Sequence, residues 1–170
     1  RKAQLSFSLG VFLCLIGSTS LIHTSLAETV AHHVVISEIR LSGGIGRSND
    51  EYVELYNPTE QSIDISNWRL VKFTKAGLAA SSTLVVFGQQ SIVPAHGFWL
   101  VAHKDYVFIQ NVVADKIYDD NILSDDNSLA LINTIGDTID LVGWGKAALF
   151  EGGAASVMPT TALPSLKRLP

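Results

Sequence analysis

Short stretches in which apolar and polar residues alternate recur along this chain of 170 residues, and turn residues separate them. An apolar repeat with helical spacing is nearly absent. The pattern predicts an all-β fold in which roughly eight short strands form a two-sheet sandwich. We expect these strands at residues 34–39, 50–56, 62–65, 68–73, 83–87, 98–103, 128–133 and 138–144.

Three of the intervening stretches are predicted to be loops. Small residues fill Lys75–Ser82, and polar and apolar residues mix without a period in Tyr106–Ser124. Gly, Ala, Thr and Pro dominate residues 145–164, which leaves little apolar surface to pack and is typical of a loop or linker.

The first 27 residues have the layout of a secretory signal peptide. Arg1 and Lys2 give a positive start, residues 9–16 (LGVFLCLI) are apolar, and Ser25–Ala27 (SLA) fits a small-x-small cleavage site. We therefore expect a signal-peptide helix over 1–27, cut before Glu28, and a flexible lead-in over 28–33. An uncleaved membrane anchor is the alternative, although five Ser or Thr and two Gly within 5–22 weaken it.

Removal of this segment would change the charge balance. All 16 acidic residues follow Ala27, whereas Arg1 and Lys2 precede it, so the remainder has a formal net charge of −6. Such a domain repels nucleic acid and anionic lipid at long range. Cys14 is the single cysteine, so the exported domain is predicted to fold without a disulfide, as a chain of about 140 residues can.

Several segments along the predicted strands carry short motifs in a fixed order. The segments are Asp50–Asn57 (DEYVELYN), Ile63–Leu70 (IDISNWRL), Pro94–Val101 (PAHGFWLV), Ser128–Leu131 (SLAL) with Gly136–Val142 (GDTIDLV), and Ser165–Arg168 (SLKR). Together they resemble the lamin tail domain family over about Val34–Arg168, with Lys167 in place of the more usual acidic residue.

The resemblance implies an immunoglobulin-like β-sandwich over residues 34–168 and implies no catalytic residues. It also implies the setting of bacterial relatives, in which such domains occur in exported surface proteins and beside secreted hydrolases or nucleases. The three tryptophans lie on separate predicted strands, where core packing is the expected role and an exposed stacking platform for a sugar is the alternative. They are Trp68, Trp99 and Trp144.

One acidic cluster could hold a cation. It comprises Asp115, Asp119, Asp120, Asp125 and Asp126. Irregular loops with carboxylate and carbonyl oxygens suit calcium, so we hypothesise weak calcium binding here, with a solvated acidic loop as the alternative. We expect no other cofactor. His96 and His103 lie at opposite ends of one predicted strand and are not expected to share a ligand.

These observations favour a non-catalytic exported module for adhesion, cell-surface attachment or positioning of a partner domain. Its expected partner is a protein or a surface glycan, and its expected location is secreted or at the cell surface. The alternative is an accessory domain of a larger secreted hydrolase or nuclease, of which this chain is a fragment. DNA binding is disfavoured because the close basic residues Arg69, Lys72 and Lys75 alternate between strand faces.

Overall fold

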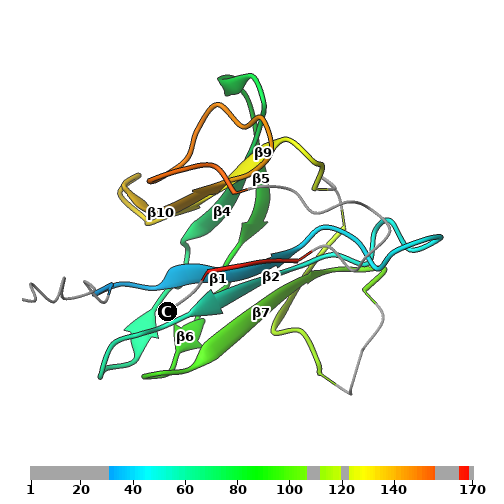
Figure 1. The fold of residues 1–170 in the computed structure, drawn as a ribbon. Coiled ribbons are helices and arrows are strands. Elements are labelled where there is room, and N and C mark those ends of the chain that lie inside the picture. The colour runs from blue at the N-terminus through cyan, green and yellow to red at the C-terminus, as the bar shows by residue number, and fades with distance from the viewer. Residues whose placement is uncertain (1–30, 107–111, 120–122, 156–164, 169–170) are drawn as a thin grey trace, which may run out of the picture.

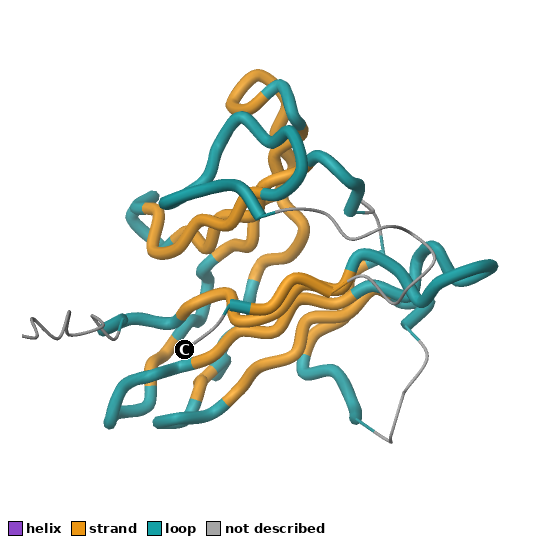
Figure 2. The backbone as a smooth tube through the Cα atoms, in the orientation of Figure 1, coloured by secondary structure: helices purple, strands orange, loops and turns teal. Residues whose placement is uncertain are grey.

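Two sheets packed face to face form the body of the protein (Figure 1). The structure, a computed structural model, describes residues 31–106, 112–119, 123–155 and 165–168. These residues hold eleven strands and no helix (Figure 2). The predicted all-β, immunoglobulin-like sandwich is thus confirmed, whereas the predicted signal-peptide helix over 1–27 lies outside the described residues.

The first sheet has five strands. Its spatial order is β11 (Ser165–Lys167), β1 (Val35–Arg40), β2 (Tyr52–Tyr56), β7 (Phe98–His103) and β8 (Lys116–Tyr118). All neighbours are antiparallel except β7 and β8, which run parallel. The last described strand therefore lies beside the first one, as the red and blue ribbons of Figure 1 show.

The second sheet has four antiparallel strands. Its order is β10 (Thr138–Gly143), β9 (Asn127–Ile132), β4 (Arg69–Thr74) and β5 (Gly77–Val86). A short separate pair joins β3 (Ile63–Asp64) to β6 (Ile92–Val93).

Period-two alternation places the core between the sheets. In β2, Val53 and Leu55 are fully buried, whereas Tyr52, Glu54 and Tyr56 are partly exposed on the other face. Residues Leu70, Leu129 and Leu131 of the second sheet are likewise fully buried. Each aliphatic side chain buried in this way contributes about 1.5–3 kcal/mol of transfer free energy.

The tryptophans take the expected packing role. Trp144 is fully buried and its indole N–H donates to the Ser124 carbonyl oxygen at 2.6 Å. Trp68 and Trp99 pack, partly buried, against the same core. None of them supplies an exposed stacking surface.

A second apolar cluster lies on the opposite face of the four-stranded sheet. Val71, Phe73 and Ala130 are buried there, and Leu149 of the 145–155 loop packs against them. Residues 145–155 form a loop, as expected, but the expectation that they have little to pack is wrong for Leu149 and for the buried Ala147.

Two further segments differ from the sequence-based expectation. Residues 77–82, expected to be a loop, are part of β5, which turns back on β4 through a two-residue connection after Thr74. Within the stretch expected to be irregular, Lys116–Tyr118 forms β8. In both cases pairing with a neighbouring strand outweighs weak local strand preference.

Candidate functional site

Three aspartates of the predicted calcium site have different partners in the structure. The Asp115 carboxylate accepts from the Leu100 backbone N–H at 2.7 Å, and Asp119 pairs with Lys104. Asp126 accepts from the Lys146 backbone N–H at 2.8 Å. Asp120 lies outside the described residues.

Three of these carboxylates therefore serve three different structural contacts. Over the described ranges, no group of three or more His, Cys, Asp or Glu side chains is placed to hold a metal ion. Calcium binding by the full acidic cluster stays a prediction.

The two histidines also have separate partners. His96 Nε2 lies 3.2 Å from Glu60 Oε2 on the surface. The buried His103 accepts at Nδ1 from the Asp105 backbone N–H at 3.1 Å, and its Nε2 lies 3.0 Å from the Asp119 carbonyl oxygen. The ring of His103 thereby links the end of β7 to the residue that follows β8.

A buried carboxyl group that the sequence analysis did not single out lies just before β2. Glu51 is fully buried; its Oε2 accepts from the Tyr118 hydroxyl and from the Leu123 backbone N–H, each at 3.0 Å. Burial raises the pKa of the Glu51 carboxyl to about 7, although both hydrogen bonds and the nearby positive charge of Lys72 oppose this. Because Glu51 is enclosed, it is an internal support for the segment around β8.

A signal for Glu51 was present in the sequence. Alternation in Asp50–Asn57 puts residue 51 on the same face as Val53 and Leu55, which is the core face. An acidic residue at a core position of a strand marks a buried hydrogen-bonding group.

The outer face of the five-stranded sheet carries aromatic side chains, of which Phe98 is exposed and the tyrosines are partly exposed. Tyr56 of β2 lies opposite Phe98 of β7, and their ring centroids are 4.7 Å apart with planes inclined at 31°. Phe98 is 58% exposed. At the other end of the same face, Tyr52 meets Tyr106 edge to face at 5.7 Å.

Two carboxylates lie between these aromatic pairs. Glu38 of β1 and Glu54 of β2 are direct cross-strand partners. Hydroxyl groups hold both: the Tyr52 hydroxyl donates to Glu38 at 2.8 Å, and the Ser37 hydroxyl donates to Glu54 at 2.7 Å. Like charges in such positions destabilise a sheet unless neighbours compensate.

We call this surface the aromatic face and define it by Glu38, Tyr52, Glu54, Tyr56 and Phe98. Tyr52 and Tyr56 are four residues apart on one strand, so the aromatic pairs are about 13 Å apart along it. The face thus offers apolar rings at two points and hydrogen-bond acceptors between them.

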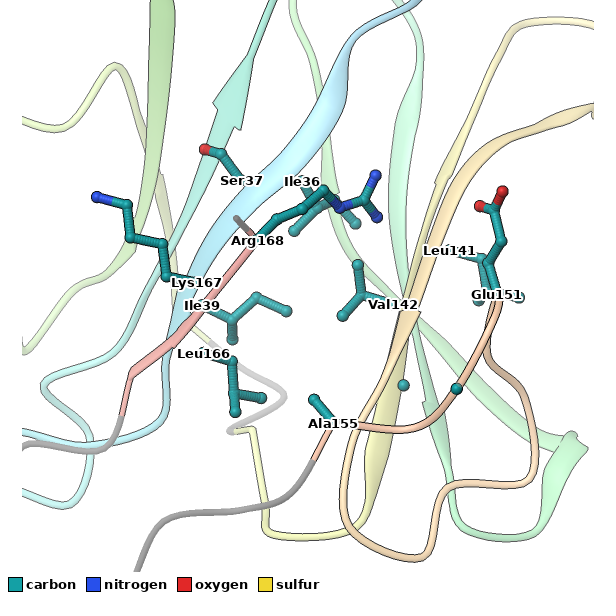
Figure 3. Close-up of a pocket in the computed structure, with 12 residues that line it drawn as sticks. Ile36, Ser37, Ile39, Leu141, Val142, Glu151, Ala155, Leu166, Lys167 and Arg168 are labelled. Carbon is teal, nitrogen blue, oxygen red and sulfur yellow. The ribbon is translucent and has the colours of Figure 1, made fainter. Parts of the chain in front are cut away.

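A cavity of about 210 Å³ lies on the open side of the sandwich, between β1 and β11 on one side and β10 with residues 151–155 on the other (Figure 3). Ile39, Val142 and Leu166 line it with apolar surface, and Glu151 and Arg168 contribute charged groups. The cavity has no buried unpaired polar group among these five residues.

Beside the cavity, a buried carboxylate ties the two sheets together. Asp140 of β10 accepts from the Ile36 backbone N–H at 2.6 Å and from the Arg168 guanidinium at 2.9 Å. We therefore assign this region a mainly structural role.

Comparison with protein families gives a match over most of the chain. The model of the lamin tail domain family matches residues 27–146, and no curated protein matches significantly. Within the part of the chain that the structure describes, no helix is long and apolar enough to cross a membrane. The family match covers most of the chain and agrees with its two-sheet architecture, and on these grounds the chain belongs to the lamin tail domain family.

Proposed function

We propose that this chain is an exported, non-catalytic binding or scaffolding module, and that the aromatic face is its binding surface. The observation that carries the proposal is the tilted ring contact between the partly exposed Tyr56 and the exposed Phe98 on the outer sheet face. Exposed aromatic side chains supply large contact area with little loss of conformational freedom, and they are enriched in binding surfaces.

The polar part of the face supports the same proposal. Glu38 and Glu54 are held by hydroxyl donors from Tyr52 and Ser37, so their positions are fixed before any partner arrives. Fixed acceptors between apolar rings suit a partner that presents both apolar surface and hydrogen-bond donors, such as a surface glycan or a protein segment. Attachment to a surface or positioning of a partner domain would follow from such binding.

Array binding tests this function directly. Residues 28–170 would be applied to glycan arrays and to arrays of extracellular proteins, together with Phe98→Ala and Tyr56→Ala. We expect a partner for the wild-type chain, and we expect each variant to lose about 1–3 kcal/mol of binding free energy with little loss of fold stability.

A matched control distinguishes binding through the aromatic face from nonspecific hydrophobic adsorption. Ile135 is 81% exposed in the turn between β9 and β10, so Ile135→Ala removes exposed apolar surface elsewhere. Binding should be unchanged in that variant. The proposal is wrong if the wild-type chain binds no component of either array, or if wild type and Phe98→Ala bind equally well.

A further inference from the structure

Glu54 lies at the centre of the aromatic face and has an open hydrogen-bonding position. Its Oε1 atom accepts from the Ser37 hydroxyl at 2.7 Å. Its Oε2 atom has no hydrogen-bond or ion-pair partner within the part of the chain that the structure describes. The side chain is partly exposed, so Oε2 can accept from a donor on another molecule.

The surroundings of Glu54 favour a positively charged partner. Glu38 lies directly opposite on β1, and two like charges in such positions repel each other. Leu100, opposite on β7, adds no charge. The Lys167 ammonium lies 3.8 Å from the Glu38 carboxylate, but its strand β11 borders β1 and not β2. A cation bound at Glu54 would therefore offset the repulsion, and the formal net charge of −6 after residue 27 would attract it at long range.

Aromatic rings lie on both sides of Glu54 along β2. Tyr52 and Tyr56 are each two residues from Glu54, so the three side chains share one face at intervals of about 7 Å. Tyr56 also contacts Phe98 of β7. Tyrosine rings attract cations, and the Arg40 guanidinium already lies 6.0 Å from the centroid of the Tyr52 ring. The order along the strand is thus ring, carboxylate, ring.

We infer that the aromatic face binds an extended protein segment with a Lys or Arg between two apolar residues, in the order apolar-x-basic-x-apolar. An extended chain repeats its side-chain direction every two residues, as β2 does. Its three facing side chains would therefore meet the first ring, the carboxylate and the second pair of rings. The basic group donates to Oε2 of Glu54, and its alkyl stem packs on the tyrosine rings.

The charge of the face favours such a protein segment over a glycan. The hydroxyl groups of a neutral sugar would not offset the negative charge of Glu38 and Glu54, and an acidic sugar would add to their repulsion. The inference rests on the proposed function and narrows its partner to a protein with this residue pattern.

The experiment titrates isotopically labelled residues 28–170, which contain every described strand, with two synthetic peptides. Leu-Ser-Arg-Ser-Leu and Leu-Ser-Gln-Ser-Leu, each acetylated and amidated, differ only in the central charge. We expect the Arg peptide to shift the amide NMR resonances of β2 and β7 and to bind about tenfold more tightly than the Gln peptide. Added salt should reduce this preference, because Glu54 is partly exposed.

Variants of Glu54 test which group reads the charge. Glu54→Gln keeps an oxygen that can accept from Ser37, and it should bind both peptides equally. Glu54→Lys should reverse the preference and favour Leu-Ser-Glu-Ser-Leu over the Arg peptide. Glu151→Gln is the matched control: it removes an exposed carboxylate from the loop after β10 and should keep the wild-type preference.

The possible outcomes separate this inference from the proposed function. The inference is overturned if the wild-type chain binds neither peptide or both equally, or if Glu54→Gln still prefers the Arg peptide. Binding to glycans alone on the arrays would also overturn it. In each of these cases, array binding that Phe98→Ala weakens would leave the proposed binding function standing.

Discussion

Glu51 shows how a single carboxyl group couples this fold to pH. Its pKa is about 7 in the folded protein and about 4.5 in the unfolded chain, because burial disfavours the charged form. Between these values the folded protein holds a proton that the unfolded chain has released. The stabilisation linked to this proton is complete below pH 4.5, decreases as the pH rises, and is lost above about pH 7.

Replacement of Glu51 by Gln should remove this pH dependence. The amide oxygen of Gln can still accept from Tyr118 and Leu123, but it does not titrate. The free energy of unfolding of wild type relative to Glu51→Gln should fall by up to about 3 kcal/mol from pH 4.5 to 7. Urea unfolding of both proteins at the two pH values measures this difference in free energy of unfolding. Glu60→Gln, at an exposed position, is the control. A difference that is equal at both pH values contradicts the prediction.

At the scale of elements, the loop after β10 depends on a close approach at Gly143. A Cβ atom there would collide with the Leu149 carbonyl oxygen and lie 2.8 Å from Cβ of Phe150. The same loop brings Leu149 onto the apolar cluster of the four-stranded sheet and accepts from the Ser128 hydroxyl at 2.6 Å. Gly143 therefore permits the loop to cover that face.

Gly143→Ala should lower the free energy of unfolding by about 2–4 kcal/mol, since the collision is with backbone and the loop has to move away. Gly153→Ala in the same loop should change it by less than about 0.5 kcal/mol, because a Cβ there meets nothing within 4 Å. Thermal unfolding of the two variants beside wild type makes the comparison. Equal stability of the two alanine variants would show that the loop does not pack as described.

The elements also show what could be predicted from the sequence. Alternation in Tyr52–Tyr56 identifies which side chains face outward, and so predicts three of the five residues of the aromatic face. The other two depend on register: Phe98 lies beside Tyr56 through a pairing between residues distant in sequence. Glu38 lies opposite Glu54 only because the register shifts between Ile36 and Glu38. Neither non-local pairing nor an irregularity of this kind leaves a local pattern.

At the scale of the whole molecule, the predicted export has a direct consequence for the N-terminus. If Ser25–Ala27 is the cleavage site, the exported product begins at Glu28 and has lost Cys14. We expect N-terminal sequencing and intact-mass measurement of the exported product to give Glu28 as its first residue and no cysteine. A product that retains residues 1–27 would instead favour the uncleaved anchor.

The pairing of β11 with β1 sets the order in which the domain can fold. Residue 36 is bonded to residue 140, and Glu38 pairs with Lys167, so the first strand makes its contacts with the last described segments. Contacts between such distant residues require large loops to close, and proteins rich in them fold slowly, in roughly milliseconds to seconds. During synthesis, β1 therefore cannot pair with β11 until residue 168 has left the ribosome. The five-stranded sheet thus gains its last edge strand only when the C-terminal end of the described chain is available.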